Sequence, residues 1–351
     1  MKIAIISEEL NFPIDEGFKK VVYEIVNVLK DEHKVIFIGK HSIDISGCLC
    51  KAIRTNKLFL NKSLFKTLSQ FNPEVILYIP YSSITMASLL RAWILKIFLG
   101  KRIIILALQP RYYHIFSKYF IPFFRPDLLL VLSKKSEEYY QQLSFKVKKI
   151  PLGVNLNRFK PLDKEEKIQL RKKYGIPEDK KVVLHIGHLK KSRNIDSLVQ
   201  TVQKEDIFLL LVTSTSTFAD EELRKNLHNT NNIKIIDWYV ENIEEIYQLS
   251  DRYLFLVEDP MGCIEIPLSV LEAMACNLPV ITTRFGGLPD WFREKDGLIF
   301  IDKKVDLSQI LKNLTNIFPK TRPLVKPLSW NEVSKIIIKQ INEKRRYIDE
   351  I

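Results

Sequence analysis

The sequence predicts an α/β protein with two doubly wound domains, each built on a parallel β-sheet. Short apolar runs without polar alternation recur between helical stretches, which is typical of strands buried on both faces of a parallel sheet. The series starts a second time after residues 150–161, where proline, glycine and asparagine mark irregular chain. A chain of 351 residues is long enough for two such cores.

The first series begins with a predicted strand at residues 2–7, followed by a polar loop and a helix from about Phe18. That helix carries apolar residues on one stripe at helical spacing: Phe18, Val21, Val22, Ile25, Val28 and Leu29. Further strands are predicted at residues 35–38, 75–79, 103–108 and 128–132. These elements define a first domain over residues 1–155.

The second series defines a second domain over residues 156–328. Its strands are predicted at residues 182–186, 207–212, 233–236, 253–257 and 280–283. Ser329 and Glu332 have the spacing of a capping box, which predicts a terminal helix within residues 329–351.

The basic charge of the chain is unevenly distributed. The formal net charge is +13, and residues 51–125 hold twelve basic residues against one acidic residue, Glu74. This asymmetry favours an anionic partner, which could be a membrane surface, a nucleic acid or a phosphorylated acceptor. Chance clustering in a lysine-rich protein is the alternative. Because no RNA- or DNA-reading motif accompanies the bases, we expect no nucleic acid partner and favour an anionic membrane surface.

Two stretches within residues 51–125 leave alternatives open. A helix predicted over residues 84–99 carries the aromatic and basic residues that suit a membrane interface: Trp93, Phe98, Arg91 and Lys96. The same helix is apolar nearly all round, which is also the pattern of a core helix. The aromatic run within residues 112–124 suits core in the first place, and an acceptor wall or a membrane-contact face are the alternatives.

The cysteines and the first residues indicate a compartment. Cys48, Cys50, Cys263 and Cys276 do not complete a zinc pattern, so we expect reduced thiols. The charged residues near Met1 do not fit a signal peptide. We therefore expect a cytoplasmic protein, with peripheral attachment to the inner face of the membrane.

The first loop argues against a dinucleotide-binding oxidoreductase. A dinucleotide fingerprint needs closely spaced glycines after the first strand, so that the backbone can approach a pyrophosphate. The loop over residues 8–17 contains only Gly17, and no G-x-G-x-x-G occurs in the chain.

The stretch over residues 258–290 carries the most chemistry. An acidic loop leads through Pro267 into a short helix with Glu272, then into a strand and the pair Gly286 and Gly287. A carboxylate on that helix can accept two hydrogen bonds from a ribose diol, and backbone amides in a glycine turn can donate to a phosphate. The alternative interpretation is an exposed helix residue followed by an ordinary turn.

Several motifs together give this stretch a family resemblance. Residues 272–281 (EAMACNLPVI) and 285–290 (FGGLPD) resemble the donor-site core of the family-4 retaining glycosyltransferases of GT-B fold, among the glycosyl transferases group 1. Residues 150–161 are similar to the hinge segment of that family, and residues 187–196 to its diphosphate-binding loop. The resemblance implies two facing Rossmann-like domains and a C-terminal helix, from residues 328–330 on, that crosses back to the first domain.

The resemblance also implies roles for individual residues. Glu272 matches the glutamate that binds the nucleotide ribose, and Gly286 and Gly287 match the glycines beside the donor. Arg193 is the candidate catalytic cation on the departing diphosphate. The remaining candidates for diphosphate binding are His188, Lys190 and Lys191.

The chain departs from the family pattern at three places. His188 replaces the arginine that commonly follows the glycine of the diphosphate loop, and its charge depends on pH. Ile264 occupies the position of the first of two family glutamates; either the loop shifts register so that Glu265 serves as the catalytic carboxylate, or that contact is lost. In the first domain, Gln109 stands where the family often has a histidine, so the acceptor-side candidates are Gly17, Gln109 and His114.

The reaction implied is transfer of a sugar from a nucleotide diphosphate sugar, UDP- or GDP-linked, with retention of configuration. Because no D-x-D occurs in the chain, we expect neither a metal ion nor another cofactor. The acceptor is expected to be a saccharide, either lipid-linked or membrane-proximal. Two alternatives stay open, namely a soluble saccharide synthase or epimerase-like relative, and a non-catalytic protein that binds nucleotide sugars.

Overall fold

The computed structural model describes residues 1–53, 59–81, 83–188, 199, 207–213, 227, 230–302 and 319–343. The chain divides into two compact units. Unit 1 contains Met1–Leu152, Cys263–Ile266 and Trp330–Ile351, and unit 2 contains Gly153–Gly262 and Pro267–Ser329. Residues 263–266, which sequence reasoning assigned to the second domain, therefore group with unit 1.

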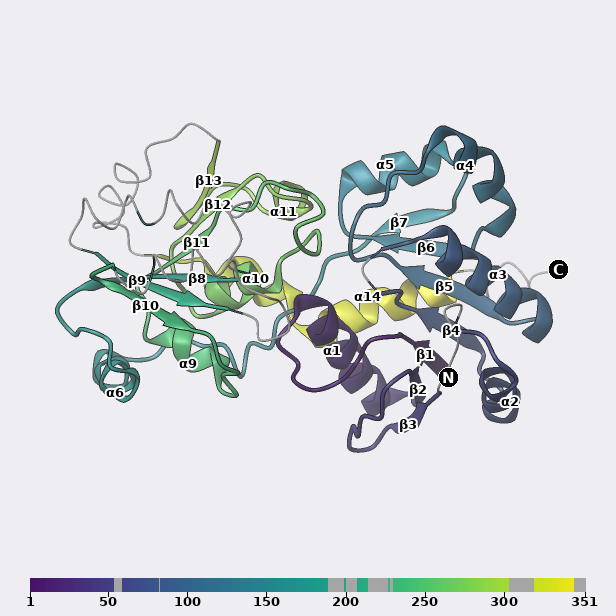
Figure 1. Cartoon of the computed structure of the whole chain (residues 1–351), viewed down its shortest axis with the longest axis horizontal. Helices are drawn as coiled ribbons and strands as arrows, with labels where there is room; N and C mark the ends of the chain where they lie inside the picture. Colours follow the sequence, from purple (N-terminus) through teal and green to yellow (C-terminus); the bar gives the residue numbers. More distant parts are fainter. Residues whose placement is uncertain are drawn as a thin grey trace. The chain divides into compact units, whose positions relative to one another are not determined.

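Unit 1 is built on a seven-stranded parallel sheet with the order β3-β2-β1-β4-β5-β6-β7 (Figure 1). Its strands are β1 (Lys2–Ile6), β2 (Lys34–Gly39), β3 (Leu49–Ala52), β4 (Val75–Tyr78), β5 (Arg102–Leu106), β6 (Leu128–Val131) and β7 (Val147–Lys149). Apart from the exposed Lys2, the residues of β1, β4 and β6 are apolar, mostly isoleucine, leucine and valine, and are buried, as a parallel sheet covered by helices on both faces requires.

Along the sequence, the helices of unit 1 lie between these strands, except α14, which follows unit 2. They are α1 (Gly17–Glu32), α2 (Lys62–Phe71), α3 (Met86–Leu99), α4 (Ile115–Phe120), the 3₁₀ helix η1 (Ile121–Phe124), α5 (Lys134–Gln142) and α14 (Trp330–Asn342). The terminal helix α14 packs against α1, and Arg102 of β5 donates to the carbonyls of Gln340 and Ile341 near its end. The sequence prediction that the last helix returns to the first domain is therefore confirmed.

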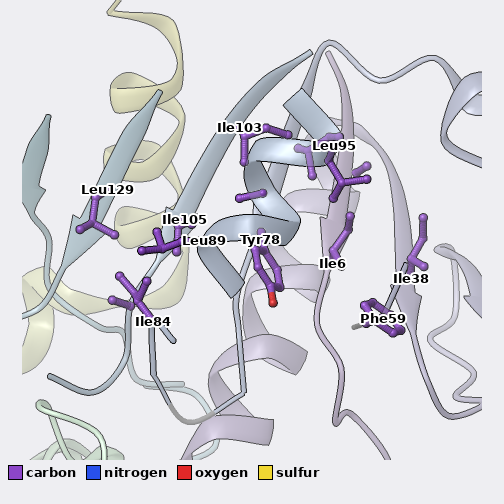
Figure 2. Packing of buried hydrophobic residues seen from close by; sticks show 14 of the residues in the cluster. Ile6, Ile38, Phe59, Tyr78, Ile84, Leu89, Leu95, Ile103, Ile105 and Leu129 are labelled. Atoms are coloured by element: carbon purple, nitrogen blue, oxygen red, sulfur yellow. The ribbon is translucent and has the colours of Figure 1, made fainter. Parts of the chain in front are cut away.

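One face of the sheet in unit 1 packs against α2 and α3. Alternate strand residues, such as Ile6 of β1 and Tyr78 of β4, share a buried cluster with Leu89 and Leu95 of α3 (Figure 2). This period of two is the expected geometry of a strand, since successive side chains point to opposite faces. Ile3 and Ile5 alternate with these residues and are also buried, so the opposite face is covered as well.

Unit 2 contains a six-stranded parallel sheet with the order β10-β9-β8-β11-β12-β13. Its strands are β8 (Lys181–Ile186), β9 (Ile207–Val212), β10 (Ile233–Ile236), β11 (Arg252–Phe255), β12 (Val280–Thr283) and β13 (Leu298–Ile301). Its described helices are α6 (Lys164–Tyr174), α9 (Ile243–Gln248), α10 (Leu268–Ala275), α11 (Leu288–Trp291), α13 (Arg322–Val325) and η4 (Lys326–Leu328).

Both sheets reverse their strand order next to the first strand of the unit. The reversal lies between β1 and β4 in unit 1 and between β8 and β11 in unit 2. In open α/β sheets, ligands bind outside the carboxyl ends of the strands at such a reversal. The segments that follow β1, β4, β8 and β11 are therefore the expected positions of a ligand site. The predicted fold class, two Rossmann-like domains with parallel sheets, is confirmed.

Candidate active site

Glu272 lies in the middle of α10 and is buried, with 5% of its surface exposed. The hydroxyl of Tyr247, on α9, donates to its Oε2 at 2.7 Å. Burial and the neighbouring Glu272 raise the pKa of Tyr247 well above its ordinary value, so that the hydroxyl stays protonated and donates. The interpretation of Glu272 as an exposed helix residue is therefore wrong, and the carboxylate is held in a fixed orientation.

The position of α10 follows from the residues at its two ends. Pro267 precedes the first turn, where its missing N–H costs no hydrogen bond. At the other end, Asn277 adopts a left-handed conformation. Its Nδ2 donates a hydrogen bond to the Pro319 carbonyl, and its Oδ1 accepts one from the Arg322 amide. The Arg322 guanidinium donates to the carbonyls of Ala275, Leu156 and Phe159. The end of α10 is thereby tied to the predicted hinge segment, residues 150–161.

The glycine pair follows β12 directly. Gly286 has φ of +52°, a left-handed conformation that favours glycine, and Gly287 precedes the short helix α11. The amide of Leu288 donates to the Phe285 carbonyl at 3.0 Å, which closes the turn. The turn predicted from sequence is present at the carboxyl end of a central strand, and its contact with a donor stays a prediction.

The diphosphate loop is described only at its beginning. Gly187 and the half-buried His188 come directly after β8, next to the strand reversal of unit 2. Lys190, Lys191 and Arg193 lie outside the described residues, so their predicted roles stay predictions. His185, within β8, is buried, and its Nδ1 lies 3.0 Å from the Leu254 carbonyl oxygen, as predicted for a core histidine.

Glu265 belongs to a buried polar cluster of unit 1. Its Oε1 accepts hydrogen bonds from the hydroxyls of Ser133 at 2.6 Å and Ser136 at 2.7 Å, at the start of α5. Ser133 also caps α5, since its Oγ accepts from the amide of Ser136 at 3.0 Å. A carboxylate at a helix N-terminus is stabilised by the helix dipole. These hydrogen bonds anchor residues 263–266 to unit 1. They give Glu265 a structural role that was not predicted from the sequence.

Replacing Glu265 with alanine is therefore expected to lower the free energy of unfolding by about 1–3 kcal/mol, because two buried hydroxyls lose their acceptor. Urea denaturation measures this change. Glu138→Ala on α5 is the matched control: the pair of Glu138 with Lys134 at 3.7 Å is exposed and should contribute less than about 1 kcal/mol to stability. Equal stabilities of the two variants would contradict the anchoring role.

The acceptor-side candidates fall into two places. The side chain of Ile264 packs close to Gly17: a Cβ added to Gly17 would lie 3.2 Å from Ile264 Cδ1. The amide of Glu265 donates a hydrogen bond to the carbonyl of Leu108, the residue before Gln109. Gly17 and Gln109 thus border residues 263–266 at the carboxyl edge of the first sheet. His114 is exposed and directly precedes α4. The substrate contacts of all three stay predictions.

Sequence reasoning also missed a buried ion pair in the first loop. Glu8 follows β1 and accepts from Arg91 and from the Tyr78 hydroxyl, while its Oε2 accepts from the Tyr81 amide at 3.0 Å. Both charged side chains are less than one-tenth exposed. This cluster lies at the strand reversal of unit 1 and fixes the start of the β1–α1 loop. No local pattern could have revealed it, because the partners are 83 residues apart.

Comparison with known proteins bears on the second unit. The sequence profile of the glycosyl transferases group 1 matches residues 166–317. These residues are therefore similar to the group 1 glycosyltransferases. They hold the three motif residues Glu272, Gly286 and Gly287, and the resemblance predicted from the motifs is confirmed. Membership of family 4 stays a prediction.

Alignments with individual relatives cover part of the chain. It is 35% identical over 138 residues to N-acetyl-alpha-D-glucosaminyl L-malate synthase of Bacillus anthracis, an alignment spanning 38% of the chain and 35% of that protein. It is 26% identical over 175 residues to the GDP-mannose-dependent monoacylated alpha-(1-6)-phosphatidylinositol monomannoside mannosyltransferase of Corynebacterium glutamicum, spanning 47% and 46%. The chain thus spans less than half the length of these curated relatives.

The fold is shared with solved structures over nearly the whole length of the chain. HepE of Anabaena, solved in complex with UDP-glucose, superposes with a TM-score of 0.76 over 97% of this chain and 99% of HepE, at 14% identity. At that identity the likeness concerns the fold alone. Among the described residues, no group of three or more histidine, cysteine, aspartate or glutamate residues could hold a metal ion.

Proposed function

We propose that this chain transfers a sugar from a UDP- or GDP-linked donor to an acceptor. The observation that carries the proposal is the buried Glu272, oriented by Tyr247 and followed by the glycine turn at Gly286. A carboxylate fixed in this way can accept hydrogen bonds from both hydroxyls of a ribose, and backbone amides of the turn can donate hydrogen bonds to the diphosphate. The names of relatives support both nucleotides, since HepE was solved with UDP-glucose and the mannosyltransferase is GDP-mannose-dependent.

The proposed reaction proceeds with retention of configuration and without a metal ion. Sugar transfer develops negative charge on the departing diphosphate, and fixed cations and amides can stabilise that charge. Arg193 supplies the main cation in this proposal, with His188, Lys190 and Lys191 beside it. The lack of a D-x-D in the sequence supports the proposal that no metal is needed.

The acceptor in this proposal is a lipid-linked saccharide reached from the cytoplasmic side of a membrane. Two observations support it. The mannosyltransferase relative is named for a phosphatidylinositol monomannoside. The basic residues of the chain are also concentrated at 51–125.

A turnover assay tests the proposed reaction. The full chain is incubated with a panel of UDP- and GDP-sugars, with either soluble saccharides or a lipid-linked saccharide in detergent, and release of the nucleotide diphosphate is followed. We expect release from one donor, stimulated by the lipid-linked acceptor, and undiminished by excess EDTA. The anomeric configuration of the product, read by NMR, should be that of the donor.

Each alternative has its own outcome in the same assay. Stimulation by soluble saccharides only would favour a soluble saccharide synthase. Donor binding without release of nucleotide from any donor would favour a non-catalytic protein. Loss of turnover in EDTA with recovery in magnesium would show that metal independence is wrong.

A further inference from the structure

Unit 1 exposes a group of large apolar side chains on neighbouring helices. They are Ile97 and Phe98 of α3, Tyr119 and Phe120 of α4, and Phe123 of η1. Phe98 is 74% exposed, and Tyr119 and Phe123 are each 72% exposed. Single exposed apolar residues are ordinary, but several on adjoining elements indicate an interaction surface. We call these five residues the aromatic surface.

The elements that carry the aromatic surface are held firmly. The helix η1 packs against both α3 and α4. Ile121 of η1 is fully buried in the core, and the rings of Trp93 and Phe124 meet edge-on with centroids 5.5 Å apart. The buried Ile121 and the Trp93–Phe124 ring contact thus hold the backbone of η1 in place, while the neighbouring side chains of Phe120 and Phe123 are exposed to solvent.

The charged residues within segment 111–125 are all basic. Lys118 of α4 is exposed, as are Arg111 and Arg125 on either side of the helices. Among the described residues between 59 and 125, the acidic residue is Glu74. The two bases that the sequence analysis associated with a membrane interface do not contribute, because Arg91 is buried beside Glu8 and Lys96 pairs with Asp127 at 2.8 Å.

We infer that the aromatic surface enters the headgroup region of an anionic lipid bilayer, with Lys118, Arg111 and Arg125 against the lipid phosphates. Aromatic rings favour the membrane–water interface, and bases near an anionic leaflet are attracted to it. A bilayer fits better than a folded partner because exposed rings and bases share the short segment 111–125, which contains no acidic residue, as in an interfacial anchor. Among the residues that the structure describes, no helix is long and apolar enough to cross a membrane.

This inference extends the proposed function, because it provides the route to a lipid-linked acceptor, but its test needs neither donor nor acceptor. The full chain is sedimented with phosphatidylcholine vesicles and with vesicles that also contain phosphatidylglycerol, at low and high salt. We expect binding to the anionic vesicles only, weakened by salt. The double variant Tyr119→Ala/Phe123→Ala should bind at least about tenfold more weakly. The control Trp238→Ala removes a 52% exposed ring from unit 2 and should bind like the unmodified chain.

A second readout detects insertion directly. In the variant Phe123→Trp, the added tryptophan emission should shift to the blue with anionic vesicles and not with neutral ones. Failure of the unmodified chain to sediment with anionic vesicles would overturn the inference, as would equal binding by the double variant. Concentration-dependent self-association that the double variant loses would assign the surface to a second copy of the chain instead. Turnover of nucleotide sugars without vesicles is measured separately, so failure of the membrane contact and failure of the proposed reaction are distinguishable.

Discussion

Glu8→Ala is expected to lower the free energy of unfolding by about 3–5 kcal/mol, because it leaves the Arg91 guanidinium buried without its carboxylate. The side chains of Glu8 and Arg91 are 8% and 6% exposed, and Glu8 also accepts from Tyr78 and from the Tyr81 amide. Burial and the carboxylate raise the pKa of Tyr78 well above its ordinary value, so the phenol remains a donor throughout the accessible pH range. Urea denaturation of the full chain measures the loss.

The neighbouring Glu9 supplies the control. Its pairs with Lys40 at 2.8 Å and His41 at 3.0 Å are partly exposed, so Glu9→Ala should cost no more than about 1 kcal/mol. The double variant Glu8→Leu/Arg91→Met should recover much of the stability lost in Glu8→Ala, because it removes both charges and keeps the volume. Similar losses in Glu8→Ala and Glu9→Ala would contradict the assignment of a buried ion pair.

Glu272→Ala is expected to reduce donor affinity by roughly ten- to a hundredfold, the effect of losing hydrogen bonds to a charged group, about 1.5–3 kcal/mol. Titration calorimetry with the preferred donor measures the change, and circular dichroism checks the fold. Tyr247→Phe is the matched control, since it removes only the 2.7 Å hydrogen bond to Glu272 Oε2. That variant should lose about 1 kcal/mol of stability, and its donor affinity should fall by less than in Glu272→Ala, because the carboxylate is kept and only its orienting hydroxyl is lost. Unchanged donor affinity in a folded Glu272→Ala chain would remove Glu272 from the donor site.

The central strands were predictable because burial on both faces leaves an unbroken apolar run. β9 and β12 were predicted with their observed bounds, and β1 and β4 to within a residue. The strands that sequence reasoning missed are short edge strands. β3 is mostly exposed and β7 has a single buried residue, so neither shows the apolar pattern. β13 is an apolar edge strand directly after a turn at Gly297, and its length of four residues equals that of β12.

The candidate site was predictable only where its residues are close in sequence. Glu272 and the glycine pair lie within one helix–strand–turn unit, so their spacing carries information. The bonds of Glu265 to Ser133 and Ser136 join residues 132 and 129 apart, and no periodicity links them. The buried stripe of α1 was also predicted only in part. Val28 was placed on that stripe, but in the structure Val28 is half-buried and Val26 is buried. Such details depend on which neighbour covers each face.

Titration of nucleotides and nucleotide sugars into the full, unmodified chain tests the central claim most directly, namely that unit 2 holds a nucleotide-sugar donor. The panel contains UDP, GDP and their common sugar conjugates, and binding is read by calorimetry and by thermal unfolding. We expect saturable binding of one nucleotide and its conjugates, with a stabilisation of about 2.7 kcal/mol at a ligand concentration a hundred times the Kd. A folded chain that binds no member of the panel, by either measurement, would contradict the claim.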